Sequence, residues 1–306
     1  MAQMFVDAIG AGIQSARCPV AYINQVMQPI TGYTRVVMER GQVPYVIPGL
    51  RQAVVALRHV AWWSQVIRTP ATAAPREPVP VPAPDRRRGR WSEHAARGLL
   101  SDAGIPVVPA RLVRSADEAA EAAAGFGGPL SVKIVSADIL HKSDIGGVRL
   151  DVPADEDAVR AAYQAVTGAV PAGARIEGAL ISPMRRGGAE LLVGVVRDPQ
   201  WGPVLAVAVG GVFVEVLRDS ALAPLPVSAA QAGPLLDRLR GRAVLDGVRG
   251  GAPADRDALA AVIARIGDLA LALGEDLESL EVNPLLADGS RIEALDAVVT
   301  WKEPDR

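Results

Sequence analysis

A proline-rich stretch after the first quarter of the chain constrains the fold most, because it divides the chain into two parts that cannot share one continuous core. Residues 69–90, TPATAAPREPVPVPAPDRRRGR, combine repeated prolines with four arginines near the end. Segments of this composition are extended, solvated spacers. We therefore expect a short unit at residues 1–68, a linker at residues 69–90 and a larger domain at residues 91–306. The 306 residues, 50% of them apolar, suffice for two separate cores.

The charge balance makes some classes of partner improbable. Lys and Arg number 32 and Asp and Glu number 34, so the formal net charge of -2 gives no field that would attract nucleic acid or an anionic membrane. The arginines at 86–90 have no interleaved aromatic residues and are typical of a solvated hinge. We expect a small molecule or another protein as partner, with no nucleic acid and no membrane.

The single cysteine and the N-terminal residues predict a cytoplasmic protein. Cys18 has no second cysteine with which to form a disulfide or a cysteine metal cage, and it suits a reducing compartment. The opening residues, MAQMFVDAIG, have no basic region ahead of an apolar stretch, so we expect no signal peptide. No apolar run approaches the roughly 20 residues that a membrane-spanning helix needs.

The short unit has the pattern of a parallel α/β layer. Apolar runs at 18–26 and 43–47 predict strands, and amphipathic patterns at 29–40 and 48–66 predict helices. Strands that alternate with helices form a parallel sheet. Because two strands leave such a sheet with poorly covered edges, we expect this unit to be part of a larger α/β domain.

The larger domain has an α+β pattern with many consecutive strands. It begins with a helix at 92–103, for which Ser92 is the predicted N-cap. Turn sequences at 185–188 (RRGG) and 287–290 (ADGS) predict hairpins, so we expect largely antiparallel sheets. The predicted strands are 108–113, 130–135, 148–152, 177–184, 190–198, 204–209, 212–217, 279–283 and 291–299, and the other predicted helices are 115–125, 154–168, 229–240 and 255–273.

The stretch VKIVSADILHKSDIGGVRLDV holds two of the three lysines in the chain, Lys133 and Lys142. An inward-facing lysine on an apolar strand is costly unless an anion meets it. Phosphate is a natural partner for an ammonium group. Gly146 and Gly147 allow the loop after the strand to move or to approach a ligand closely. The stretch therefore indicates a phosphate contact for Lys133, and an ordinary polar loop with a snorkelling lysine is the alternative.

The sequence SLEVNPLLADGSRIEALDAVV predicts a hairpin with polar side chains on one face. If its DG pair forms the turn tip, Glu281 faces Asp296 across the strands and Asn283 lies on the same face. Two opposed carboxylates need a cation between them, and carboxylate and carboxamide oxygens suit Mg²⁺. The hairpin therefore predicts a metal site, and a slipped register that turns Asp296 to solvent is the alternative.

A glycine pair, Gly210 and Gly211, lies between two apolar stretches in AVAVGGVFVEV. By itself the pair is compatible with a simple tight hairpin. Together with Lys133 and the predicted metal site, it also suits the approach of a nucleoside triphosphate to the backbone. We therefore include both glycines among the candidate nucleotide-binding residues.

These stretches follow one another as they do in a known family. VKIVSADILHKSDIGGVRLDV, GALISPM, ELLVGVVRDPQWGPVLAVAVGGVFVEVLRD and LEVNPLLADGSRIEALDAVV closely resemble the ATP-grasp subunit or domain of ADP-forming acyl-CoA synthetases, such as acetate–CoA ligase, which are relatives of succinyl-CoA synthetase. The resemblance runs through residues 91–306 and implies an α+β ATP-grasp fold with mixed or antiparallel sheets and helices. Residues 18–66 resemble the end of the flavodoxin-like ligase domain of single-chain members, so residues 1–68 are expected to be a partial flavodoxin-like α/β segment.

The resemblance implies that ATP, a small carboxylic acid and CoA are converted to ADP, phosphate and acyl-CoA through an acyl phosphate and phosphohistidine. It implies ATP or ADP and Mg²⁺ as ligands of this chain, and CoA as a co-substrate bound mainly by a partner subunit that carries the CoA-binding and first phosphohistidine domains. By motif position, the resemblance implies that Lys133 contacts the ATP phosphates and that His141, on a mobile loop, carries the phosphoryl group. The hinge strand with Ile181, Ser182 and Met184 is expected to contact adenine through its backbone. Asn283 and Asp296 are the implied Mg²⁺ ligands, and Glu281 is the implied acidic residue beside the phosphorylated histidine.

The chain departs from the family pattern in ways that leave other functions open. The sequence shows no complete CoA-binding domain and no first phosphohistidine domain, so we expect it to bind nucleotide without completing the ligation by itself. After Asp219, where family members commonly have an arginine, the sequence reads SALAPLP. A nucleotide-binding regulatory or truncated remnant is one alternative. An ATP-grasp ligase that joins a carboxylate to an amine is another, and it would have no use for His141.

Overall fold

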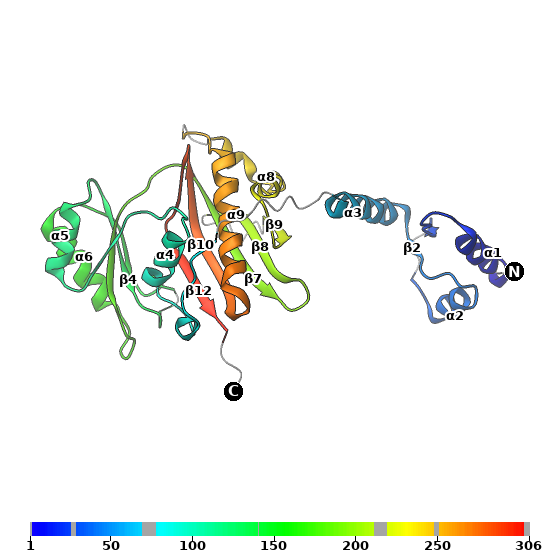
Figure 1. Ribbon diagram of the computed structural model, residues 1–306, viewed down its shortest axis with the longest axis horizontal. Coiled ribbons are helices and arrows are strands. Elements are labelled where there is room, and N and C mark those ends of the chain that lie inside the picture. The colour runs from blue at the N-terminus through cyan, green and yellow to red at the C-terminus, as the bar shows by residue number, and fades with distance from the viewer. Residues whose placement is uncertain are drawn as a thin grey trace. The chain divides into compact units, whose positions relative to one another are not determined.

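The computed structural model describes residues 2–25, 29–68, 78–139, 141–210, 219–247 and 251–302 (Figure 1). The chain forms two compact units, a small unit at Met1–Thr72 and a large unit at Ala73–Arg306. No helix in the described ranges is both long and apolar enough to cross a membrane.

The small unit alternates helices with strands. β1 pairs with β2 in parallel, as the sequence predicts. Both strands are shorter than predicted, which fits a sheet without a third strand among the described residues. The predictions do not include the first helix. The elements are α1 (Ala2–Ser15), β1 (Ile23–Asn24), α2 (Gly32–Arg40), β2 (Ile47–Pro48) and α3 (Leu50–Arg68).

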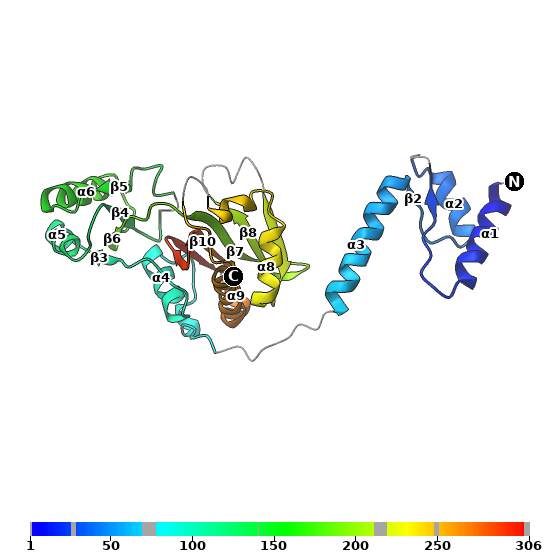
Figure 2. The same cartoon turned by 90° about the horizontal axis from the view of Figure 1, so that it is seen from above.

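The first sheet of the large unit is antiparallel, with the order β3-β6-β4-β5. Helices α5 and α6 cover one of its faces (Figure 2). Val132 and Ile134 of β4 are buried in the core beneath these helices, so the alternation of the strand places Lys133 on the opposite face. The elements are β3 (Arg111–Val113), α5 (Ala116–Ala124), β4 (Leu130–Val135), β5 (Val148–Val152), α6 (Glu156–Gly168) and β6 (Gly178–Pro183).

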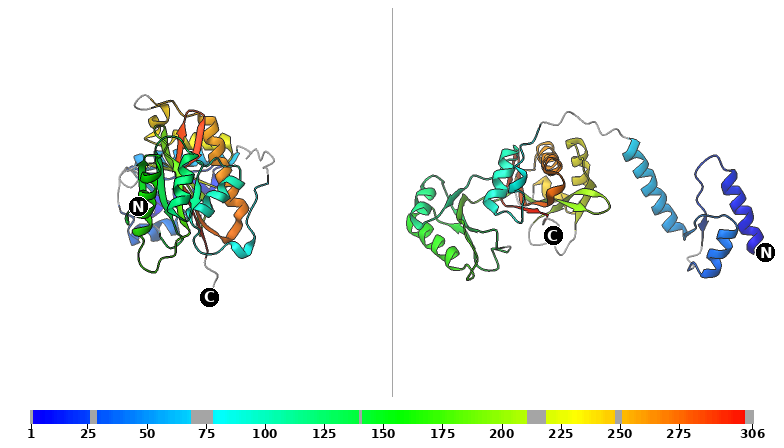
Figure 3. Two further views of the ribbon diagram at one scale, coloured as in Figure 1. Left: turned by 90° about the vertical axis from the view of Figure 1, so that its left-hand side faces the viewer. Right: turned by 60° about the horizontal axis from the view of Figure 1, so that its bottom comes forward.

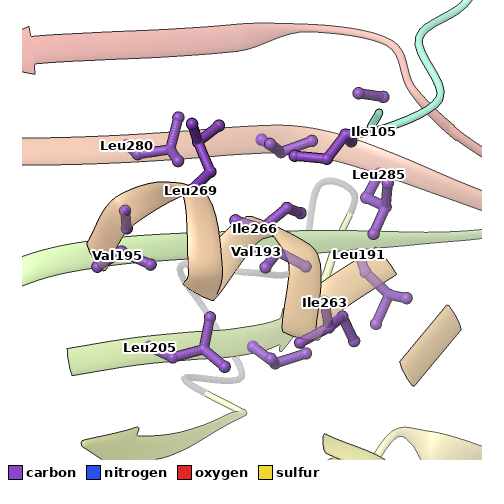
Figure 4. Packing of buried hydrophobic residues seen from close by; sticks show 14 of the residues in the cluster. Ile105, Leu191, Val193, Val195, Leu205, Ile263, Ile266, Leu269, Leu280 and Leu285 are labelled. Carbon is purple, nitrogen blue, oxygen red and sulfur yellow. The ribbon is translucent and has the colours of Figure 1, made fainter. Parts of the chain in front are cut away.

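The second sheet has the order β11-β10-β7-β8-β9, and β12 also pairs with β10. Helices α8 and α9 cover one face. Side chains of the strands, such as Val193, Leu205 and Leu280, pack with Ile266 and Leu269 of α9 (Figure 4). The elements are β7 (Ala189–Asp198), β8 (Gly202–Val209), β9 (Ser220–Pro224), α8 (Ala229–Asp237), α9 (Arg256–Leu273), β10 (Leu277–Asp288), β11 (Arg291–Ala294) and β12 (Ala297–Trp301).

Helix α4 (Glu93–Asp102) lies between the two sheets, beside β12 (Figures 1 and 2; Figure 3, right). It begins after the predicted cap, because the hydroxyl of Ser92 accepts a hydrogen bond from the N–H of Ala95 at 3.4 Å. The other predicted helices of the large unit are confirmed, with small shifts at their ends. The large unit thus has the predicted α+β architecture of antiparallel sheets and helices.

Two predictions about strands are wrong. The RRGG sequence at 185–188 connects β6 to β7, which belong to different sheets, so it is not a hairpin turn. The predicted strand at 291–299 is two strands, separated by a break at Leu295 and Asp296. β9 is not among the predicted strands, and the predicted strand at 212–217 lies outside the described residues.

The hairpin of β10 and β11 has its tip one residue later than predicted. Asp288 pairs with Arg291 in the strands, and their side chains form an ion pair. Gly289 and Ser290 therefore form the turn, and Gly289 has a left-handed φ of 59° that glycine adopts without strain.

This register changes which polar residues face each other. Glu281 lies opposite Val298, so the predicted pairing of Glu281 with Asp296 is wrong. The backbone N–H of Asn283 instead donates to the carbonyl of Asp296 at 3.2 Å. The displaced turn thus brings Asn283, and not Glu281, opposite Asp296.

Residues 84–90 belong to the segment for which the sequence predicts a linker, and they contact the large unit. Arg87 Nη1 donates to the carbonyl of Leu273 at 3.2 Å and to the carboxylate of Asp276 at 3.0 Å. The rings of Trp91 and Trp301 pack with their centroids 5.3 Å apart. The short helices of the large unit are η1 (Pro84–Arg86), η2 (Arg242–Asp246) and η3 (Gly274–Asp276).

Candidate functional site

A cluster of buried charges lies where α4, the first sheet and the second sheet meet. We call it the charge cluster; the exposed fractions of its side chains range from 2% for Glu93 to 21% for Asp296. Its members are Glu93 and Arg97 of α4, Lys133 of β4, Lys142 of the loop after β4, and Asp296 between β11 and β12.

Each lysine of the charge cluster contacts both carboxylates. Lys133 Nζ lies 3.2 Å from Glu93 Oε1 and 3.2 Å from Asp296 Oδ2. Lys142 Nζ lies 3.2 Å from Asp296 Oδ2 and forms an ion pair with Glu93 Oε2. The anions that meet Lys133 in this structure are therefore protein carboxylates, at the position where the sequence predicts a phosphate.

Arg97 adds a third cation. Its Nη1 lies 3.6 Å from Glu93 Oε1 and donates to the carbonyl of Leu295 at 2.9 Å. Three cations against two carboxylates leave the cluster with a formal charge of +1. A further anion, such as a phosphate group, is electrostatically favoured beside such a cluster.

Local sequence explains how the chain places these groups. The Ser92 cap makes Glu93 the first residue of α4, where a carboxylate interacts favourably with the helix dipole. The loop that carries Lys142 closes on itself, because the N–H of Gly147 donates to the carbonyl of Lys142 at 2.8 Å. A Cβ at Gly147 would lie 2.6 Å from Cγ2 of Ile134, so this packing of the loop against β4 requires glycine.

Burial and charge act in opposite directions on Asp296 and Lys142. Burial would raise the pKa of Asp296, but the ammonium groups of Lys133 and Lys142 outweigh it and hold that pKa below its ordinary value. Burial would lower the pKa of Lys142, but Glu93 and Asp296 outweigh it and raise that pKa. Asp296 is therefore a carboxylate and Lys142 an ammonium group at neutral pH.

Asn283 and Asp296, the predicted Mg²⁺ ligands, are neighbours. β10 has an irregular register between Val282 and Leu285, and opposite it lies the break between β11 and β12 that contains Asp296. The side chain of Asn283 is exposed, and its Nδ2 donates to Oε1 of Glu281 at 3.1 Å. Carboxylate and carboxamide oxygens are hard donors, so this set fits Mg²⁺. Among the residues that the structure describes, no three His, Cys, Asp or Glu side chains gather as metal ligands.

The predicted adenine hinge is the end of β6. Ile181 and Ser182 are buried, and Ser182 Oγ lies 2.7 Å from Oγ of Ser131 in a hydrogen bond. The N–H of Met184 donates to the carbonyl of Pro129 at 2.9 Å, so it is already engaged. β3 pairs with β6 only as far as Ile181, so in the described structure no strand pairs with that edge beyond it. Past Ile181, the backbone groups on this edge are therefore outside the strand ladders of the described residues.

His141 and the glycine pair are placed differently from the lysines. The side chain of His141 is exposed, next to the anchored Lys142, and it forms no hydrogen bond or ion pair within the described ranges. The N–H of Gly210 donates to the carbonyl of Glu190 at 2.7 Å, and a Cβ there would lie 2.8 Å from that oxygen. The close backbone approach at Gly210 is therefore to β7. Gly211 lies outside the described residues.

A surface groove of about 760 Å³ lies against α4, lined by Arg90, Trp91, His94 and Gly98 among others. It contains none of the predicted site residues. The groove and the charge cluster are therefore separate features of the same helix.

Sequence reasoning missed three members of the charge cluster. Lys142 could have been found from its rarity, because the chain has only three lysines. Glu93 and Arg97 carry no such signal, since charged residues at the start of a helix are common on protein surfaces. Only the fold shows that these two side chains are buried.

Comparison with known proteins places the large unit in a family. The profile of the ATP-grasp domain matches residues 82–300. Acetate–CoA ligase (ADP-forming) I of Archaeoglobus fulgidus is 41% identical over 195 residues, which are 62% of this chain and 28% of that protein. Subunit beta of acetate–CoA ligase (ADP-forming) I of Pyrococcus furiosus is 35% identical over 207 residues, which are 67% of this chain and 89% of that subunit.

A solved structure shows the same fold. It is dinucleotide forming acetyl-coenzyme A synthetase 1 of Ca. Korarchaeum cryptofilum in complex with coenzyme A, Ca-AMPCP and HgCl+. The TM-score is 0.67 at 34% identity, and the match covers 70% of this chain and 94% of that one. The chain therefore belongs to the ATP-grasp family, with the beta subunits and corresponding domains of ADP-forming acetate–CoA ligases as its relatives.

Proposed function

We propose that this chain is the ATP-binding component of an ADP-forming acyl-CoA synthetase. The net reaction converts ATP, a carboxylic acid and CoA to ADP, phosphate and acyl-CoA, through an acyl phosphate and phosphohistidine. The observation that carries the proposal is the convergence of Lys133 and Lys142 on Asp296, beside Asn283, in a chain of this family.

The proposed roles follow from the chemistry of each group. The charge cluster has an excess of positive charge, so Lys133 can receive the phosphate of a nucleotide. Asn283 and Asp296 would hold Mg²⁺, which when bound neutralises charge on the phosphate oxygens. The end of β6, with Ile181, Ser182 and Met184, would contact the adenine ring through its backbone.

His141 is proposed as the phosphoryl carrier. An imidazole nitrogen can take a phosphoryl group and pass it on, which divides one difficult transfer into two. Its exposed side chain suits an exchange with a second protein. Glu281, whose carboxylate accepts a hydrogen bond from Asn283, would lie beside the phosphorylated imidazole and orient it.

The proposal includes a partner subunit. The chain spans 89% of the Pyrococcus subunit beta but only 28% of the Archaeoglobus ligase. The partner would bind CoA and carry the first phosphohistidine, and together the two would take a small carboxylic acid as substrate. A cytoplasmic location, expected from the single Cys18, is part of the proposal.

The first test mixes the purified chain with a candidate CoA-binding subunit, ATP, Mg²⁺, CoA and a series of small carboxylic acids. We expect ADP release that requires both CoA and acid. His141→Ala should reduce it to background, and His59→Ala, which changes an exposed histidine of α3, should retain it. Full activity in His141→Ala would contradict the role of His141. Binding of ATP with Mg²⁺ but no turnover with any partner would favour a nucleotide-binding module instead.

The nucleotide site has its own test. Lys133→Met removes a charged phosphate contact and should weaken ATP binding about tenfold or more, measured by isothermal titration calorimetry. The matched variant Asp276→Asn removes a carboxylate from the ion pair with Arg87 and should leave ATP affinity unchanged. Equal affinity of the wild type and Lys133→Met would exclude Lys133 from the nucleotide site.

A further inference from the structure

We propose that Glu93 is a positioning residue that holds Lys142 and thereby fixes the segment carrying His141 beside the nucleotide site. The inference rests on the proposed function only for the chemistry of His141. The anchoring of the segment rests on contacts within this structure.

The carboxylate of Glu93 is almost completely buried and fully engaged. Its side chain is 2% exposed. Oε1 lies 3.2 Å from Nζ of Lys133 and 3.6 Å from Nη1 of Arg97, and Oε2 forms the ion pair with Lys142. Burying one carboxylate among three cations is costly unless each contact is well formed. This arrangement therefore holds the two lysines in defined positions.

Glu93 can keep its ion pair with Lys142 when a bound metal ion occupies the carboxylate of Asp296. Lys142 has two carboxylate partners, Glu93 and Asp296. Asp296 is 21% exposed and is the proposed metal ligand, so a divalent cation and Lys142 would compete for the same oxygens. Glu93 contacts both lysines, and its side chain is almost completely buried. It is the partner that would still hold Lys142 with nucleotide and metal in place.

The anchored lysine restricts His141 because the two residues are adjacent, with Cα atoms about 3.8 Å apart. The segment is also tied down at its other end. The N–H of Gly147 donates to the carbonyl of Lys142 at 2.8 Å, and the N–H of Ile134 in β4 donates to the carbonyl of Gly147 at 2.8 Å. One side-chain anchor and one backbone anchor thus decide where His141 is presented.

The anchoring is tested by hydrogen exchange on the full chain without nucleotide. Glu93→Gln and Lys142→Met should each make the amides of Gly146 and Gly147 exchange at least about tenfold faster, because the segment opens more often. Lys142→Arg keeps the ion pair and should restore slow exchange. The control Asp276→Asn should match the wild type. Native protection in both Glu93→Gln and Lys142→Met would overturn the proposal.

The functional consequence is tested by single-turnover phosphorylation of His141 at saturating ATP. Glu93→Gln should form phosphohistidine roughly 10- to 100-fold more slowly, since a small displacement of a reacting group has effects of this size. It should bind ATP as tightly as the wild type or more tightly, because the cluster has lost a negative charge. A general loss of structure would weaken binding and transfer together, and that result would overturn the positioning role.

A charge-matched variant separates anchoring from charge balance. Glu93→Gln with Lys142→Met has the same formal charge as the native cluster, so it is expected to fold. It should still show fast exchange at Gly147 and slow phosphorylation. Recovery of the native exchange and rate in this double variant would show that only the charge balance matters, and would overturn the proposal. Absence of phosphohistidine in the wild-type chain would instead contradict the proposed function, while exchange still reports on the anchor.

Discussion

At the scale of single residues, Asp296 has one role in this structure and a second role in the proposed function, and the two would compete for the same carboxylate oxygens. In this structure its carboxylate neutralises Lys133 and Lys142. In the proposed function the same carboxylate would hold a metal ion beside Asn283. Lys133, which contacts Asp296 here, is the group that would turn to the phosphates of a bound nucleotide, while Lys142 would stay with Glu93. If the proposed function holds, this one carboxylate couples the buried ion pairs to the binding of metal and nucleotide.

The stability of the chain should depend on the ionisation of Asp296. Its pKa is lower in the folded than in the unfolded chain, so its carboxylate stabilises the fold above the unfolded value of about 3.9. That contribution is lost as the pH falls through the lowered folded value. Asp296→Asn should therefore unfold at a lower urea concentration than the wild type at pH 7 and pH 5. The difference between the two urea midpoints should narrow below about pH 4.

The control for this prediction is Asp117→Asn, which removes an ion pair between Arg160 and a carboxylate that is 81% exposed. Exposed ion pairs contribute little to the free energy of unfolding, so we expect the urea midpoint of Asp117→Asn to lie close to that of the wild type at every pH. If the difference in urea midpoint between Asp296→Asn and the wild type stayed constant down to pH 3, the charge of Asp296 would not be what stabilises the folded chain.

At the scale of elements, two interruptions of regular structure place the polar groups. The irregular register of β10 faces the break between β11 and β12, and this removes Asn283 and Asp296 from a continuous ladder. The loop after β4 returns to its own strand through Gly147. Regular strands would point alternate side chains into the core, so the site depends on where the ladders are interrupted.

Gly147→Ala should destabilise the loop that carries Lys142. The added Cβ would lie 2.6 Å from Cγ2 of Ile134 and 3.0 Å from the carbonyl oxygen of Lys142. Relieving this overlap moves the loop or β4, at a cost of about 1–3 kcal/mol in the free energy of unfolding measured with urea. Gly127→Ala is the matched control, because its Cβ would meet nothing within 4 Å, and it should change stability by less than about 0.5 kcal/mol. Equal free energies of unfolding for the two variants would show that the loop can move to accommodate the added Cβ without loss of stability.

At the scale of the whole molecule, the two units differ in how much apolar surface they bury. The large unit has two extensive core clusters, one for each sheet. In the described part of the small unit, the buried apolar side chains are Val37, Val43 and Ala53, while Tyr33 and Trp63 are 71% and 58% exposed. The free energy of unfolding increases with the apolar surface that folding buries, so we expect the small unit to be less stable than the large unit.

Calorimetry of the full chain should therefore show two transitions. The small unit should unfold first, at a temperature that ATP and Mg²⁺ do not change. The transition of the large unit should shift upward, by an amount equivalent to about 2.7 kcal/mol at a hundredfold excess of ligand over its Kd. Lys133→Met should reduce this shift. A ligand-dependent shift of the first transition would contradict the assignment of the nucleotide to the large unit.

The sequence by itself determined the class of the fold and most of its elements. Helix caps such as Ser92, apolar runs such as that around Lys133 and the parallel pattern of the small unit are local signals, so they can be read without the fold. The order of the family motifs then predicted an ATP-grasp fold. The family match over residues 82–300 confirms that fold.

Only the tertiary structure decided the contacts that make the site. The turn at Gly289 and Ser290 shifted the hairpin register and replaced Glu281 by Asn283 as the neighbour of Asp296. Glu93 joined the two lysines although it lies 40 residues before Lys133 and 49 residues before Lys142, in a different element. Register and long-range burial also depend on how distant segments pack, so a local pattern such as the DG pair does not decide them by itself.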